Sequence, residues 1–382
     1  MTLADWNPGN LSSSPQSPMP NYFAPAFFVR ISGQVLTADV SNCVQHIEVT
    51  DATDRAATFT ITVANPYPGL PWTHGPSADL WFQTGKIVNI ALGYEGDTQD
   101  MIVGEITAIR PHFPGGGIPT LTVTGKSMMH KLQGSLNSRA FVKKTDKEIV
   151  EEIAIALGLE PDVEDAGIRH DYVMQPNHTD MEFILTRAAR IHFELLVNGT
   201  KLIFRKIRDT GKESCTLVWG HTQEAMSGTN HFPLISFEPT LRGGQMWPEV
   251  KLRSWHAETN SMIEGKATTS HEDENAGETK KAGEVWTDAY QRSKEYVRVT
   301  GSVASQEEAN MRARARLHDH AIRLITGHGT TIGLPLLRAG ILVRIDGVGD
   351  LFNGLYKITS TTHTLGEGGY GTTFDVERPS AK

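Results

Sequence analysis

The stretch that decides the fold is LLRAGILVRIDGVGDLFNGLYKITSTTHTLGEGGYGTTFDVE, residues 336–377. Apolar and polar residues alternate over 341–346, 355–362 and 370–376, and glycine-containing turns at 347–350 and 366–369 separate these runs. Period-two alternation bounded by glycine clusters predicts strands joined by tight turns. The stretch is therefore predicted to form two or three antiparallel strands.

An earlier stretch repeats this pattern. GKIVNI (85–90) matches GILVRI (340–345), GEITAI (104–109) matches GLYKIT (354–359), and GGGIPTLTVT (115–124) matches GGYGTTFDV (368–376). The first two glycines are 19 residues apart in one copy and 14 in the other, which turn length can explain because loops tolerate insertion. We therefore expect two similar antiparallel β-barrels in one chain, although any two β-meanders share part of this pattern.

Composition limits the class of protein. The chain has 382 residues, 39% of them hydrophobic, which is enough for two or more domains with packed cores. Its net charge is 36 minus 44, or −8, which argues against specific nucleic-acid binding because that needs a basic surface. No apolar run reaches the length of a membrane span, so no membrane insertion is expected. The first 24 residues lack the basic and apolar regions of a signal peptide.

Changes of pattern along the chain divide it into segments. The fold class predicted is mainly β, with α+β insertions. The predicted segments are a flexible N-terminal segment (1–26), a first β-barrel (27–130), an α+β module (131–206), strands shared with the barrels (207–256), a polar insertion with a helix (257–335), and the closing strands of a second barrel (336–382).

Three capping boxes predict helices inside these segments. They begin at Thr145, Thr179 and Ser305, and each has a glutamate three residues later. Apolar residues at helical spacing follow each box, and Gly158 and Gly327 are the expected ends of the first and third helices. Asn198-Gly199 predicts a type I′ hairpin turn after the second helix.

No catalytic, cofactor-binding or metal-binding residue is assigned, and no cofactor is expected. Cys43 and Cys215 are far apart and are interpreted as buried or half-buried thiols. His318 and His320 are two positions apart on the third predicted helix, so they point in different directions and do not suit one metal ion. The run HEDE (271–274) lacks the HExxH spacing, and GEGGYG (366–371) lies between strands, with no helix N-terminus to hold a phosphate.

Several stretches together resemble the phage late control protein D family, the central baseplate hubs of contractile tails, whose fold also forms the N-terminal part of type VI secretion spike proteins. Within QPNHTDMEFILTRAARIHFELLVNGTKLIFRK (175–206), the residues that match the family's pattern are Gln175, Thr179, Asp180, Phe183, Arg187 and Ala189. EVKLRSWHAETNSMIEGKA (249–267), SQEEANMRARARL (305–317) and the closing β stretch continue the resemblance, which covers about 27–378.

The resemblance implies a structural, non-enzymatic hub. It implies two tube-like barrels per chain and a homotrimer that forms a pseudo-sixfold ring. That ring would adapt the sixfold inner tube to a threefold spike. The partners implied are the inner tube protein, a separate spike protein and other baseplate components. The location implied is the baseplate of a virion tail or a phage-derived injection particle, assembled in the bacterial cytoplasm.

Two other functions stay open from the sequence. A tail-tip cell-wall hydrolase would need a groove that pairs two carboxylates, and no motif places such a pair. A carbohydrate-binding tail-tip protein would use exposed aromatic residues such as Trp72, Trp81 or Trp247; side chains of this kind more often pack in a core or an interface.

Overall fold

The computed structural model describes residues 24–65, 72, 81–207, 212–220, 230–242, 247, 249–256, 260–268, 280–281, 295–299, 303 and 305–381. Structural statements below refer to these residues. The predicted flexible N-terminal segment and the HEDE run lie outside them, apart from residues 24–26.

The first β unit is one strongly curved sheet around a single core. Its order is β2-β1-β5-β6-β7-β4-β3, and every neighbouring pair is antiparallel. Alternate residues of these strands point inward, as the sequence pattern predicts, and form a core with Phe59, Trp72 and Trp81. The elements are β1 (Pro25–Ile31), β2 (Gln34–Val35), α1 (Ala38–Ser41), β3 (Val44–Ala52), β4 (Thr58–Ala64), β5 (Ile87–Tyr94), β6 (Asp97–His112) and β7 (Thr120–Ser127).

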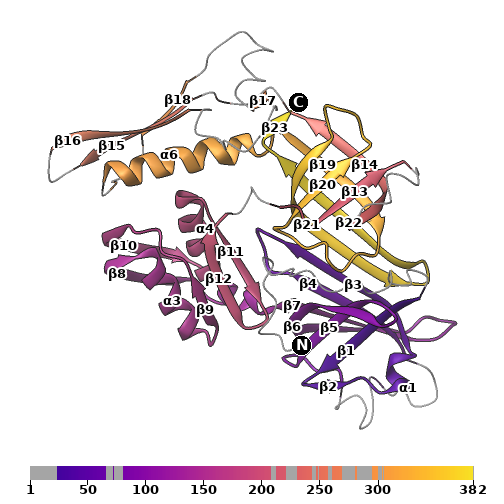
Figure 1. The fold of residues 1–382 in the computed structure, drawn as a ribbon. Helices are drawn as coiled ribbons and strands as arrows, with labels where there is room; N and C mark the ends of the chain where they lie inside the picture. Colours follow the sequence, from indigo (N-terminus) through magenta and orange to yellow (C-terminus); the bar gives the residue numbers. More distant parts are fainter. Residues whose placement is uncertain are drawn as a thin grey trace.

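The second β unit is a closed six-stranded barrel (Figure 1). Its order is β20-β13-β14-β19-β22-β21, and β21 pairs with both β20 and β22 to close it. This confirms the mainly β fold. β13 is the exception to the antiparallel pattern, since it runs parallel to β14 and to β20. The strands are β13 (Cys215–Trp219), β14 (His231–Leu241), β19 (Ile325–Ile332), β20 (Leu342–Asp346), β21 (Gly354–Gly366) and β22 (Gly369–Arg378).

An α+β module connects the two units (Figure 1). Its two-stranded sheet of β8 and β10 and its sheet β11-β12-β9 pack with α3 and α4 around a core that includes Phe141, Phe183 and Phe204. The elements are η2 (Met128–Gln133), β8 (Asn137–Thr145), α3 (Asp146–Ala156), β9 (Glu160–Val163), β10 (Arg169–His178), α4 (Asp180–Ile191), β11 (Phe193–Asn198) and β12 (Lys201–Lys206).

A second insertion lies between β14 and β19 of the barrel. The order β16-β15-β18 forms a small sheet, and α6 packs on it through Ala313 and Leu317. Gly265 allows this close approach, because a Cβ there would lie 2.1 Å from the Ala309 carbonyl oxygen. The elements are β15 (Glu249–His256), β16 (Ser261–Thr268), β17 (Lys280–Lys281), β18 (Glu295–Val299) and α6 (Gln306–Ala321); β17 pairs with β23 (Ser380–Ala381).

The helix ends test the capping predictions. Complete capping boxes begin α3 at Thr145 and α4 at Thr179, and Gly158 follows α3 with a φ of 71°, as predicted. At Ser305 only half of the box forms, because the Ser305 hydroxyl accepts from the Glu308 amide while the Glu308 side chain pairs with Arg312. The predicted end of this helix at Gly327 is wrong, since α6 ends at Ala321.

The hairpin predicted after the second helix forms between β11 and β12, but its turn is not the predicted type I′. Asn198 pairs with Lys201, so the two turn residues are Gly199 and Thr200. Only Gly199 has a positive φ, of 59°, whereas a type I′ turn needs a positive φ at both turn residues.

Candidate functional site

The candidate functional site is the joint between the two β units, and the two units correspond strand by strand. The first contains the order β5-β6-β7-β4-β3, and the barrel contains β20-β21-β22-β19-β14. When the strands of each set are counted along the chain, both sheets have the order third, fourth, fifth, second, first. All neighbouring pairs are antiparallel in both. The sequence repeat is therefore a structural repeat. The α+β module precedes the second copy, and the α6 insertion occupies its first hairpin connection.

The two units also have shifts of strand register at equivalent positions. The β6–β7 register shifts at Thr107 and the β21–β22 register shifts at Thr359. Each threonine hydroxyl donates to a carbonyl oxygen of the opposite strand, over 3.3 Å to Thr124 and over 3.2 Å to Asp375. β-bulges of this kind bend a strand at a fixed place, so both units bend in the same way.

Two further features confirm the correspondence. A register shift occurs at Gln45 between β3 and β4 and at Ile235 between β14 and β19. The Gly85 amide donates to Ile106 O and the Gly340 amide donates to Ile358 O, each over 2.8 Å. Both glycines have a positive φ, of 83° and 88°, which glycine adopts without strain.

This correspondence corrects the predicted sequence alignment. Aligning GEITAI with GLYKIT from their first residues would make Ile106 equivalent to Tyr356. The bulges instead equate Ile106 with Ile358, so the second segment is displaced by two residues. The glycines at 104 and 354 have different roles: Gly104 lies inside β6, whereas Gly354 begins β21.

The two units join through β21. Its first part pairs with β20, and after the bulge its second part, Ser360–Leu365, pairs with β3 of the first unit. The hydroxyls of Thr50 and Thr362 lie 3.2 Å apart across this joint. Beside them Arg338 donates to Asp51 over 3.1 Å. Backbone and side-chain bonds therefore make one sheet of the two units.

A cluster of buried, hydrogen-bonded polar side chains lies at the joint. His363 Nε2 lies 2.8 Å from Leu337 O, which can only accept, so Nε2 carries the proton and Nδ1 accepts from the Tyr370 hydroxyl over 3.0 Å. The Tyr94 ring from the first unit lies against Tyr370, and its hydroxyl donates to Gly333 O. Burial, followed by the charge of Arg338, lowers the pKa of His363 to about 3. The ring is therefore neutral.

The α+β module is attached to the barrel by a buried ion pair. Glu194 of β11 accepts from Arg205 over 2.8 Å and lies 3.5 Å from the ammonium of Lys357 in β21. All three side chains are buried, so removal of Glu194 would leave two buried cations without the carboxylate that they share.

Residues of the family-like pattern hold α4 in place. Gln175 Nε2 donates to Asp180 Oδ1 over 2.8 Å, and Arg139 donates to both Gln175 and Asp180. Arg187 pairs with Asp146 at the buried start of α3. Thr179 caps the helix and Phe183 stacks on Phe141, while Ala189 lines the cleft described next. Most of the pattern therefore encodes the packing of this module.

A polar cleft of about 850 Å³ separates the α+β module, α6 and the barrel. Its cationic lining residues are Arg242, Arg316, Arg323 and Lys357. Two carboxyl groups, Asp319 and Glu377, also line it, and burial raises the pKa of each. The sequence offered no signal for this pair, because one residue lies on a helix and the other 58 positions later in the last barrel strand.

The residues considered for metal or sugar binding have other partners. The ring of His318 packs against His192 and that of His320 against Trp247. Burial lowers the pKa of His320 to about 4, helped by Arg316 and Arg323. Within the described ranges no group of three or more His, Cys, Asp or Glu residues could hold a metal ion.

The aromatic residues considered for sugar binding belong to the interior. Trp72 and Trp81 are 7% and 4% exposed and are part of the first core. Trp72 Nε1 donates to Ala64 O over 2.6 Å.

Of the two cysteines, Cys215 is buried, which raises the pKa of its thiol to about 12, and Cys43 is half-buried.

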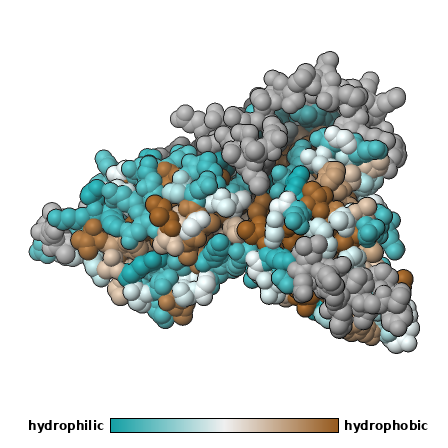
Figure 2. Space-filling model, turned by 90° about the horizontal axis from the view of Figure 1, so that it is seen from below, coloured by the Kyte–Doolittle hydropathy of each residue, from teal (hydrophilic) through white to brown (hydrophobic). Residues whose placement is uncertain are grey.

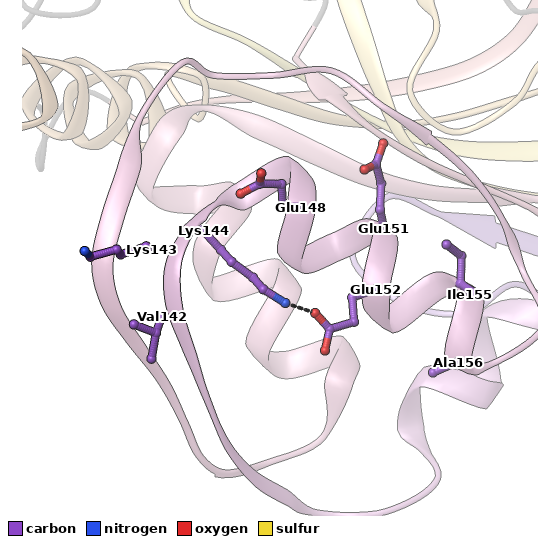
Figure 3. Close-up of a pocket in the computed structure, with 8 residues that line it drawn as sticks. All are labelled: Val142, Lys143, Lys144, Glu148, Glu151, Glu152, Ile155 and Ala156. Atoms are coloured by element: carbon purple, nitrogen blue, oxygen red, sulfur yellow. Dashed lines mark hydrogen bonds and ion pairs between the residues drawn. The ribbon is translucent and has the colours of Figure 1, made fainter.

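The outer side of the α+β module carries a shallow depression between α3 and β8. Lys144 pairs with Glu152 across it, and Val142 and Ile155 lie at its rim (Figure 3). Tyr172 and Met174 of the adjacent strand β10 are 60% and 53% exposed. In the view from below, hydrophobic side chains form patches among hydrophilic ones (Figure 2). Such patches commonly mark contact surfaces.

A family model described as the Alg8 N-terminal domain matches residues 24–367. The chain belongs to the Alg8 N-terminal domain family. The matched range includes the joint, the α+β module and the α6 insertion. The comparison with curated proteins gave no match, and among the described residues no helix is long and apolar enough to cross a membrane.

Solved structures of tail proteins share the fold of this member of the Alg8 N-terminal domain family. The 43 kDa tail protein of prophage MuSo2 from Shewanella oneidensis is 14% identical, with a TM-score of 0.67 over 93% of this chain and 99% of that one. A tail protein from Neisseria meningitidis is 12% identical, with a TM-score of 0.65 over 93% and 97%. An E. coli component of the type VI secretion system is 12% identical, with a TM-score of 0.56 over 92% and 76%.

Proposed function

We propose that the chain is a structural protein of the central baseplate hub of a contractile tail or a phage-derived contractile injection system. The observation that carries this proposal is the structural repeat, two β units with the same strand order and the same bulges in one chain. The likeness in fold to tail proteins and to a type VI secretion component supports it. It agrees with the resemblance to the late control protein D family.

The proposed mechanism is symmetry adaptation by a homotrimer. Three copies of a chain with two similar units place six similar units in a ring, while the ring itself keeps threefold symmetry. Such a ring can contact a sixfold inner tube on one side and a threefold spike on the other. The same argument proposes the tube protein and a separate spike protein as partners, and the baseplate as the location.

The insertions are proposed to contact other baseplate components. The α+β module presents Val142, Tyr172 and Met174, and the insertion sheet presents Trp255 opposite Met262, 57% and 59% exposed. Aromatic residues and methionine are enriched in protein interfaces. Their position outside the repeated strands leaves both β units available for the ring.

The experiment that tests the hub is the mass of the purified chain by light scattering, alone and mixed with its tube protein. We expect a particle three times the mass of the chain, and cryo-electron microscopy should show six similar lobes in end views. A strict monomer at high concentration, with and without the tube protein, would contradict the proposal.

A hydrolase is the second candidate, because the cleft brings together Asp319 and Glu377. The cationic residues around them favour a structural interpretation, since each carboxyl has a positively charged neighbour to balance it. Zymography on peptidoglycan decides between them. Lysis by the chain that is lost in Asp319→Asn and Glu377→Gln would establish the enzyme, and absence of lysis supports the hub.

A further inference from the structure

The joint within the chain uses one edge from each β unit, and among the described residues no strand pairs along the corresponding edges of the two units. β21 corresponds to β6, and β3 corresponds to β14. Beyond Glu105, β6 has β7 on one side and no described strand on the other. Beyond Leu234, β14 has β19 on one side and no described strand on the other. The residues that extend along these edges, including Arg110 and Thr240, are largely exposed.

The matched bulges set a register for these two edges. Thr107 corresponds to Thr359, so Arg110 corresponds to Thr362. Gln45 corresponds to Ile235, so Thr240 corresponds to Thr50. Within the chain Thr50 and Thr362 lie opposite each other. An equivalent contact between two copies would therefore place Thr240 of one copy opposite Arg110 of the next.

Neighbouring positions in this register are complementary. By the same counting Ile109 would face Leu241, and the exposed Phe113 would face Phe237. His112 would face Glu238, which gives opposite charges when the imidazole is protonated. Two of these three pairs are thus apolar with apolar and the third joins an imidazole to a carboxylate, and none of the three brings like charges together.

One position differs from the joint within the chain. There His363 lies opposite Val49, and the corresponding residues on the open edges are Pro111 and Pro239. The Arg242 amide donates to the O atom of Leu324, the residue directly before β19, so the backbone N–H of Arg242 points toward β19. Because backbone groups alternate between the two sides of a strand, Pro239 turns its nitrogen away from β19 and toward the open edge.

Pro111 has the same orientation. The Asn65 amide of the segment after β4 donates to Pro119 O, just before β7. Backbone groups alternate along a strand, so the N–H and C=O groups of Leu121 and Val123 point toward β4. Those of Thr120 and Thr122 point toward β6. Their partners in β6 are His112 and Arg110, so Pro111 turns its nitrogen to the open edge. A proline lacks the N–H group that a ladder needs, and its ring occupies that place.

We propose that a second copy of the chain docks along these two edges, in the register of the β21–β3 joint. Pro111 and Pro239 meet at its centre, where they prevent a continuous backbone ladder. The contact between copies then depends on side chains and on the ends of the strands, whereas the joint within each chain is a full ladder. The ring can open between copies and does not extend into an unlimited sheet. This inference rests on the proposed hub.

Cysteine cross-linking tests the register. Arg110→Cys and Thr240→Cys are made in separate chains and mixed under mild oxidation. We expect a disulfide-linked dimer from the mixture and much less from either variant alone. The pair Thr50→Cys with Thr362→Cys in one chain is the positive control, and Thr240→Cys mixed with Ile155→Cys, on the outer side of α3, is the mismatched control.

The outcomes separate this inference from the hub itself. A trimer by light scattering that gives no more cross-link from the matched pair than from the mismatched one would overturn the register and leave the hub intact. A chain that stays monomeric even with its tube protein would overturn both. A trimer with cross-linking by the matched pair supports both.

Restoring the missing amides tests the role of the prolines. Pro111→Thr with Pro239→Val should lower the concentration for half-maximal self-association at least tenfold, measured by sedimentation velocity. Each single variant should have a smaller effect, because the remaining proline still blocks the centre. Pro161→Thr, on the exposed strand β9, is the control. Equal association of the double variant and the wild type, or an equal gain in Pro161→Thr, would overturn this role.

Discussion

The imidazole of His363 accepts a hydrogen bond of 3.0 Å from the hydroxyl of Tyr370, at the place where the two β units become one sheet. Its other nitrogen donates to Leu337 O, and the ring has no exposed surface. Protonation would bury a positive charge near Arg338, and the Tyr370 hydroxyl would have to turn from donor to acceptor because Nδ1 would then carry a proton.

The stability of the joint should therefore depend on pH. The pKa of His363 is about 3 in the folded chain against an ordinary value of 6.5, so the unfolded chain binds more protons between these values. The contribution is fully present above pH 6.5 and is lost as the pH falls toward 3, by up to about 1.4 kcal/mol per pH unit. Urea unfolding of the wild type and of His363→Gln at several pH values measures it. If the free energy of unfolding changed with pH in the same way in both proteins, His363 would not be the group responsible.

Gly125 should not tolerate a side chain. A Cβ at this position would lie 2.2 Å from Cζ of Phe59 and 2.4 Å from the Glu105 carbonyl oxygen, so Gly125→Ala should destabilise the first unit by about 1–3 kcal/mol. Gly116→Ala is the matched control, because nothing lies within 4 Å of that position. Denaturant midpoints measure both, and equal midpoints for the two variants would show that the contact costs nothing.

The buried charges of the α+β module should be sensitive to removal of one partner. Burial alone would raise the pKa of Asp146, but hydrogen bonds from His170 and Arg187 outweigh it and lower the pKa. Asp146→Ala would leave Arg187 buried without its carboxylate, at a cost of about 3–5 kcal/mol.

Glu151→Ala serves as the control for this variant. It removes a more exposed pair with Lys147 at 3.8 Å and should cost less than about 1 kcal/mol. Calorimetry gives both values, and a similar loss from both variants would contradict the difference in burial.

Removal of the capping residues Thr179 and Ser305 should lower the free energy of unfolding by different amounts. Thr179→Ala breaks a complete capping box and should cost about 1 kcal/mol, whereas Ser305→Ala breaks half of one. We expect a larger loss for Thr179→Ala, with faster hydrogen exchange in the first turn of α4. A larger loss for Ser305→Ala would mean that the Glu308 side chain supports that helix end more than its pairing with Arg312 suggests.

Local signals in the sequence predicted the elements well. Period-two alternation and glycine clusters predicted β20, β21 and β22, and two of the three capping boxes formed completely. These features depend on neighbours in the chain. The third box formed by half because Arg312, one turn later, competes for Glu308, and the wrong turn at Asn198 arose because strand register places the turn one residue later.

By itself the sequence determined that the chain is mainly β, contains a repeat and carries no recognisable catalytic motif. Only the tertiary structure decided how the copies correspond, because a bulge moves register by one residue without a signal of its own. It also decided that β21 joins the units, that Asp319 and Glu377 line one cleft, and that Pro111 and Pro239 lie on edges with no described strand beside them. Each of these depends on which strands lie side by side, and long-range pairing brings together residues that are far apart in the chain.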